Sequence, residues 1–249
     1  MKSILLALAA AQAAPLSDEA RFRSCTALIK TAPEQAIETA SQWRIGGGGF
    51  FARQCLGLAY SALQRWAPAA TAFEQAARDA ERAKDPSAGD FWVQSGNSWL
   101  AAGDGLKARQ AFDAALVTTS LSAELRGEAY LDRARAGVLL GDIAGARADI
   151  DRGLKLVPAD PFGWYLSSAL ALREKDLARA KEAVEKAISL APDDADVLLQ
   201  AGNVAGVSGD AEGAVAYYAR AAKAQPGSAA GKAAQAALAA NAASATETE

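Results

Sequence analysis

Apolar positions in the second half of the chain recur with a period of 34 residues. Each period holds a small residue, a bulky apolar residue, a second small residue and a proline at the same spacing. The three sets are Ala146, Ile150, Gly153 and Pro158; Ala180, Val184, Ala187 and Pro192; and Ala214, Tyr218, Ala221 and Pro226. This period predicts helix-turn-helix units that stack into a solenoid, because a single unit cannot bury its own apolar face.

The same spacing can be followed back toward the N-terminus. The predicted units are 17–46, 50 onward, 89 onward, 127–160, 161–194 and 195–228. Extra residues at 83–88 and 118–122 predict lengthened loops, and the glycines of 46–49 predict a flexible connector. An alanine-rich helix from Ser228 to about Ala240 is expected to cap the array, with more room around Ala234 than around the alanines between paired helices. Residues 241–249, which are small, polar and acidic, predict a disordered tail.

The full pattern resembles the tetratricopeptide repeat family. The third unit carries most of the family's positions, namely Trp92, Gly96, Trp99, Gly103, Ala108, Phe112 and Ala115. The second unit departs from the pattern, because Gln64 stands where the family has a turn glycine. The resemblance implies an all-α, right-handed α-solenoid of about six repeats over residues 17–240, with a C-terminal capping helix. It implies a binding scaffold but names no partner.

Composition narrows the possible functions. The chain has no histidine and only two cysteines, which removes His-based triads and most zinc sites. Its 26 basic and 29 acidic residues are mixed, and the absence of a basic block argues against nucleic acid as a partner. Acidic pairs such as Asp193 and Asp194 are interpreted as solvated helix faces or helix N-termini. The sequence therefore predicts a non-enzymatic protein without a cofactor, a metal ion or a membrane span.

The first thirteen residues suggest export. Lys2 precedes an apolar run, and Ala11-Gln12-Ala13 has the form of a cleavage site, as in a secretory signal peptide. The alternative is an apolar N-terminal helix that stays on the protein. Export predicts a periplasmic or cell-envelope protein of a bacterium, and retention predicts a cytoplasmic one.

Cys25 and Cys55 occupy the first helices of the first and second units. Equivalent helices of adjacent units are neighbours in the family's fold, so the resemblance implies that a disulfide can join them. An oxidising compartment would favour that bond, and closing a loop of this size contributes roughly 3–4 kcal/mol. The alternative is two buried thiols that act as small core residues.

The resemblance also implies which residues line a concave groove, since fixed positions of the first helix of each repeat face it. The resulting candidates are Phe51, Gln54, Asp90, Asn97, Arg135, Phe162, Tyr165, Arg173 and Asn203, with the apolar Leu58, Val93, Leu131 and Leu199 at equivalent positions. Exposed aromatic side chains beside amides and guanidinium groups suit peptide capture. Any of them can instead pack against a neighbouring helix.

Two functions remain at this stage. The first is a protein–protein interaction scaffold or adaptor that holds a peptide or protein segment in the concave groove. The alternative is a structural subunit of an envelope assembly, which binds through its convex face or its ends and forms a homo-oligomer. Substitutions on the concave surface separate the two, because only the first function loses binding.

Overall fold

The computed structural model describes residues 16–246, so the predicted signal peptide lies outside the described residues. Thirteen α-helices and no strand are present in this part of the chain. They are α1 (Asp18–Ile29), α2 (Pro33–Ile45), α3 (Gly49–Ala62), α4 (Trp66–Ala83), α5 (Ala88–Ala101), α6 (Gly105–Val117), α7 (Ala123–Leu139), α8 (Ile143–Leu156), α9 (Pro161–Arg173), α10 (Leu177–Leu190), α11 (Ala195–Val207), α12 (Ala211–Ala224) and α13 (Ala229–Thr246).

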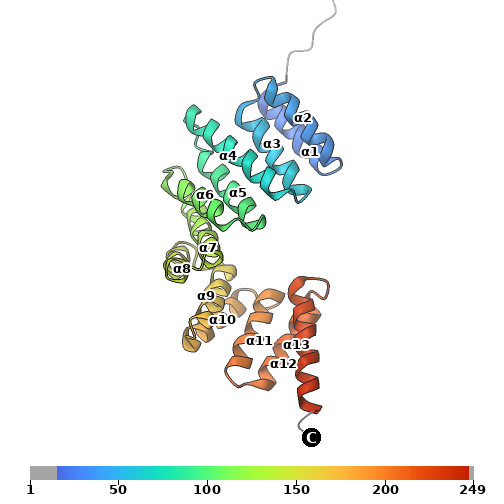
Figure 1. The fold of residues 1–249 in the computed structure, drawn as a ribbon, viewed down its shortest axis with the longest axis vertical. Helices are drawn as coiled ribbons and strands as arrows, with labels where there is room; N and C mark the ends of the chain where they lie inside the picture. The colour runs from blue at the N-terminus through green and yellow to red at the C-terminus, as the bar shows by residue number, and fades with distance from the viewer. Residues whose placement is uncertain (1–15, 247–249) are drawn as a thin grey trace, which may run out of the picture.

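The helices form six consecutive pairs closed by α13, and the ribbon follows an arc with α7 to α9 near its middle (Figure 1). Each pair packs together, and its first helix also contacts the first helix of a neighbouring pair, as α5 does with α7 and α9 with α11. The predicted all-α solenoid of helix pairs is confirmed. The first helices of successive pairs therefore provide a shared surface along the array.

Small residues allow the two helices of each pair to approach closely. A methyl group added at Gly96 would lie 2.6 Å from the ring of Phe112, and one at Gly57 would lie 2.5 Å from the ring of Phe73. Ala108 and Ala180, at the predicted close contact, are completely buried. The small-large-small pattern is thus a packing rule of the core, because the rings of Phe73 and Phe112 each lie against a glycine of the partner helix.

In the second to sixth pairs, the turn between the two helices places one residue in the left-handed region, and an aspartate cap follows it in all but the second pair, where the cap position is Arg65. Gly103, Gly141 and Gly209 have φ values of 78°, 77° and 81°. Gln64 and Lys175 take the same place in the second and fifth pairs, with φ of 55° and 62°. The chain keeps the turn geometry there at a conformational cost that glycine does not have.

Arginine side chains join neighbouring pairs. Arg133 on α7 donates two hydrogen bonds to Asp149 on α8, at 2.7 and 2.8 Å, and one to Asp113 on α6 at 2.7 Å. Arg179 on α10 reaches Asp151 on α8 at 2.6 Å. These interactions connect consecutive repeats where alanine-rich helices offer little apolar surface.

The C-terminal end differs from the prediction in two respects. Helix α13 continues to Thr246, so residues 241–246, which were expected to begin a disordered tail, are helical; residues 247–249 lie outside the described part. Ala234 was expected to have room around it, because it is on the terminal cap. It is completely buried and packs with Leu198, Ala214 and Tyr218, because α13 covers the open end of the sixth pair.

Candidate functional site

Two adjoining cavities lie along α7 and α9 and share Arg135 and Leu166. The first, of about 380 Å³, is mainly apolar, and the second, of about 370 Å³, has an aromatic wall and acidic residues. We call the two together the α7–α9 groove. The first is lined by Leu100, Ala134, Arg135, Val138, Leu139, Ile150, Leu166, Ala169, Leu170 and Arg173, and the second by Arg135, Pro161, Phe162, Tyr165, Leu166, Asp194, Asp196 and Val197.

The aromatic wall is held in place by stacking. The rings of Phe162 and Tyr165, one helical turn apart on α9, are nearly parallel with centroids 6.0 Å apart. The guanidinium of Arg135 lies 5.5 Å from the Phe162 centroid and 2.9 Å from a carboxylate oxygen of Asp132. Phe162 nevertheless remains 40% exposed. Because the ring is supported from two sides and still accessible, it loses little conformational freedom on contact with a ligand.

Acidic side chains line the second cavity from α11 and continue along α7 and the start of α9. Glu124, Glu128 and Asp132 follow one another at four-residue intervals on α7 and therefore share one face of it. Asp160 and Asp194 cap α9 and α11 by accepting hydrogen bonds from Phe162 N and Val197 N, and Asp196 lies in the first turn of α11. We call these six carboxylates the acidic group. Asp132 is the one member that forms an ion pair in the described part of the chain.

The acidic group is electrostatically coupled. Burial raises the pKa of Glu128, and the nearby Glu124, Asp160 and Asp132 raise it further. Burial also raises the pKa of Asp132, against the opposing effect of Arg135 and of a hydrogen bond from Asn97.

Next to α11, burial and Asp194 raise the pKa of Asp196. Burial, Asp196 and Asp194 raise the pKa of the Tyr165 phenol, and Arg135 opposes this. The negative potential is therefore shared across α7, α9 and α11.

Five of the nine predicted groove residues come together here. Arg135, Phe162, Tyr165 and Arg173 line the groove, and Asn97 on α5 joins it through Asp132. All five lie on the first helices of the third, fourth and fifth pairs.

The other four predicted residues lie elsewhere. Phe51 packs against Phe22 and Phe50, with centroid distances of 5.9 and 4.6 Å. Asn203 accepts a hydrogen bond from the Tyr218 hydroxyl at 3.0 Å. Gln54 is half-buried on α3, and Asp90 is exposed near the start of α5, where burial of its carboxyl still raises its pKa.

The apolar candidates divide in a similar way. Val93 and Leu131 are buried in the core, so the expectation that they line a groove is wrong, because α5 and α7 turn these positions toward adjacent helices. Leu199 packs partly against the cluster of Tyr218, and Leu58 is half-buried.

Sequence reasoning missed the acidic group. The four-residue spacing of Glu124, Glu128 and Asp132 is visible in the sequence. The same spacing is common on solvent-exposed helix faces, so it does not by itself indicate a site.

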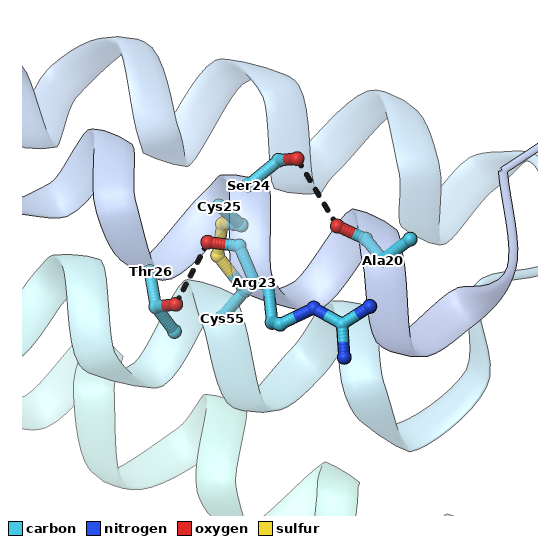
Figure 2. The surroundings of a disulfide bond; sticks show 6 residues. All are labelled: Ala20, Arg23, Ser24, Cys25, Thr26 and Cys55. Carbon is cyan, nitrogen blue, oxygen red and sulfur yellow. Dashed lines mark hydrogen bonds between the residues drawn. A yellow bond between two sulfur atoms is a disulfide. The ribbon is translucent and has the colours of Figure 1, made fainter.

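The N-terminal pairs are linked by the two cysteines. Cys25 on α1 and Cys55 on α3 form a disulfide with their Cα atoms 6.3 Å apart, and both residues are buried (Figure 2). The bond joins the first helices of the first two pairs, the arrangement that the resemblance implied. On either side of Cys25, the hydroxyls of Ser24 and Thr26 donate to the carbonyls of Ala20 and Arg23 within α1 (Figure 2).

Residues 16–246 contain neither a metal-binding cluster nor a membrane-spanning helix. No group of three or more His, Cys, Asp or Glu side chains there is arranged to hold a metal ion. None of the thirteen helices is both long and apolar enough to cross a membrane.

The comparisons with known proteins agree with the geometry. The sequence model of the tetratricopeptide repeat matches residues 163–194, which span most of α9 and α10. Among curated proteins, no sequence matches the chain. Residues 163–194 thus match one tetratricopeptide repeat, and the array as a whole shares the fold of solved tetratricopeptide repeat solenoids, which confirms the resemblance inferred from the sequence.

Solved structures share the fold at low sequence identity. PilW, a type IV pilus biogenesis factor, aligns with a TM-score of 0.71 and 19% identity over 88% of this chain and 99% of its own. PilF of Pseudomonas aeruginosa gives 0.68 and 17% over 88% and 96%. YrrB, described as a tetratricopeptide protein with an unusual peptide-binding site, gives 0.52 and 18% over 82% and 97%.

Proposed function

We propose that this chain is a non-enzymatic scaffold that holds an extended segment of a partner protein in the α7–α9 groove. The observation that carries the proposal is the convergence of Arg135, Phe162, Tyr165 and Arg173 on two cavities that adjoin. Aromatic and arginine side chains are enriched among residues that dominate binding energy. The peptide-binding site described for YrrB, which has the same fold, supports this type of use.

The groove offers two kinds of contact along one path. The first cavity is called here the leucine-rich cavity, because it is lined by Leu100, Leu139, Leu166 and Leu170. It can accept an aliphatic side chain, and the rings of Phe162 and Tyr165 can pack against the next part of the segment. Asn97 is an amide at the α5 side of the groove and can pair with peptide backbone. An extended segment suits this surface because alternate side chains point to the same side.

The test compares two triple variants of the full chain. The first, Phe162→Ala with Tyr165→Ala and Arg173→Ala, removes the groove contacts. The matched control, Val215→Ala with Tyr217→Ala and Arg220→Ala, removes an apolar, an aromatic and an arginine side chain from α12; Val215 has the same exposed fraction, 40%, as Phe162. Affinity capture followed by mass spectrometry is expected to recover a partner with the wild type and the control but not with the groove variant.

Equal recovery by the groove variant would contradict the proposal and favour the alternative, in which partners bind the convex face or the ends. Circular dichroism of both variants checks that helicity is retained. The convex alternative also predicts self-association, which sedimentation measures directly.

We further propose that the protein is exported to the periplasm or envelope. The support is the apolar, positively charged start of the sequence together with the pairing of Cys25 with Cys55, since disulfides persist in oxidising compartments. N-terminal sequencing of the protein from fractionated cells is expected to give a chain that begins near Ala14. An intact Met1 on cytosolic protein would contradict this.

A further inference from the structure

The second cavity of the groove has a wall suited to a cationic side chain. Phe162 and Tyr165 line it from α9, and Asp194 and Asp196 line it from the start of α11. One oxygen of Asp194 accepts the Val197 N–H, which leaves the other oxygen for a ligand. A ring face beside two carboxylates is the chemistry that recognises an ammonium or guanidinium group.

Negative charge exceeds positive charge around the cavity. The cavity is lined by the carboxylates of Asp194 and Asp196 and by one guanidinium, that of Arg135, which is already paired with Asp132 and placed against Phe162. The remaining members of the acidic group lie farther along α7 or at the start of α9. No member other than Asp132 forms an ion pair within residues 16–246. The field at the cavity therefore attracts a cation and disfavours an anion.

Size and surroundings restrict the ligand further. A volume of about 370 Å³ accommodates one long side chain, and the neighbouring leucine-rich cavity adjoins it at Arg135 and Leu166. Lysine and arginine carry an aliphatic stem that packs on rings while the charged group reaches polar partners.

We propose that the occupant of the groove is an extended protein segment that places a lysine or arginine side chain in the cavity between Tyr165 and Asp194–Asp196, next to an aliphatic side chain in the leucine-rich cavity. This inference rests on the proposed function and adds the chemistry of the partner. Charge complementarity at the cavity selects the partner, and the leucine-rich cavity adds apolar contact.

The matched controls are provided by the chain itself. Asp194 caps α11 and Asp196 is its second residue, just as Asp210 caps α12 and Glu212 is its second residue. The double variants Asp194→Asn with Asp196→Asn and Asp210→Asn with Glu212→Gln therefore remove the same charge from equivalent places, and asparagine keeps each cap. Neither Asp210 nor Glu212 lines the groove.

The probe is a positional-scanning decapeptide library, in which one position is fixed and the others are mixtures, applied to the full-length chain. Sublibraries with fixed lysine or arginine are expected to bind most strongly. For the best lysine peptide, fluorescence anisotropy is then expected to show at least tenfold weaker binding after acetylation of that lysine. The α11 double variant is expected to lose affinity to the same extent, and the α12 variant to keep it.

Each other outcome is informative. One contrary outcome is that peptides in which glutamine, acetyl-lysine or glutamate replaces the lysine bind with the same affinity as the lysine peptide. That result would overturn the cationic assignment and leave the scaffold function standing. If the lysine peptide binds the α11 variant as strongly as the wild type, the assignment is also overturned, because the contact lies elsewhere. If no sublibrary binds, the proposed function and this inference are both rejected.

Discussion

Arg133 and Glu128 lie on the same helix, five residues apart, in opposite electrostatic surroundings. Arg133 points between helices and is held by Asp149 and Asp113, and these partners raise its pKa. Glu128 lies among Glu124, Asp132 and Asp160 without an ion pair. The contrast separates two arrangements of charge in one array: compensated ion pairs that connect helices, and a cluster of like charges that repel one another.

The same contrast holds at larger scale. Interactions between repeats, such as Arg179 with Asp151 and Arg109 with Asp142, join second helices or their turns. The carboxylates around the α7–α9 groove belong to first helices or their caps. Substitutions in one region should therefore leave the other region unaffected.

The largest effect on stability is expected from the disulfide, which is distant from both regions. Replacement of Cys25 and Cys55 by serine should lower the free energy of unfolding by about 3–4 kcal/mol, because the unfolded chain is no longer cross-linked. Peptide affinity at the groove should stay unchanged. Thiol labelling of the denatured, unreduced protein should find no free thiol; two free thiols per chain would contradict the pairing.

Loss of Arg133 should have the next largest effect. In Arg133→Met the carboxylate of Asp149, whose side chain is only 9% exposed, loses both of its short hydrogen bonds to Arg133 and keeps only the longer one from Arg152, at 3.2 Å. The expected loss is about 3 kcal/mol, or a decrease in Tm of about 6–12 °C. Arg135→Met on the same helix is the comparison and should cost less, about 1 kcal/mol, because the Arg135 side chain is 44% exposed and Asp132 keeps its hydrogen bond with Asn97. Equal losses would contradict the division between the two regions.

Overpacking between the helices should be costly where surface changes are not. Ala180→Leu should destabilise by roughly 1–3 kcal/mol, because Ala180 is completely buried between α9 and α10. The appropriate control is the exposed Ala236 on α13, since Ala234 is buried. Urea unfolding of the two variants measures the difference, and equal midpoints would contradict the repeat packing.

The smallest expected change in the free energy of unfolding is an increase. Glu128→Gln removes two like-charge contacts at four-residue spacing on α7, so it should stabilise the fold by roughly 0.5 kcal/mol near neutral pH. Because the pKa of Glu128 is raised in the folded state, the wild type loses stability as pH rises through the ordinary pKa of glutamate. The gain should therefore disappear below that pH, where both states hold the proton. A gain that persists in acid would contradict the electrostatic cause.

The sequence predicted the repeats well because their signal is repeated. Small residues such as Ala108 and Gly96 have one packing role in every unit, so register could be set from Pro158, Pro192 and Pro226. The extra residues at 118–122 were also placed correctly, between α6 and α7. Periodic packing is local, and it can be read from spacing alone.

The groove was predicted only in part, because position in a repeat does not determine exposure. Phe51 and Phe162 occupy equivalent positions, but Phe22 of the first pair covers the former, while the latter remains accessible. The acidic group is assembled from α7 and the caps of α9 and α11, which lie far apart in the sequence. Its negative potential depends on how the pairs stack.

The central claim is that the acidic, aromatic face of α7, α9 and α11 is a binding surface separate from the packing that holds the array. Thermal unfolding with and without the best lysine decapeptide, at about 100 times its Kd, tests this directly. Wild type and Arg133→Met should both gain about 2.7 kcal/mol from the peptide, although their starting Tm values differ. The Asp194→Asn, Asp196→Asn variant should start within about 1 kcal/mol of the wild type and gain little. An undiminished gain in that variant, or none in Arg133→Met, would contradict the account.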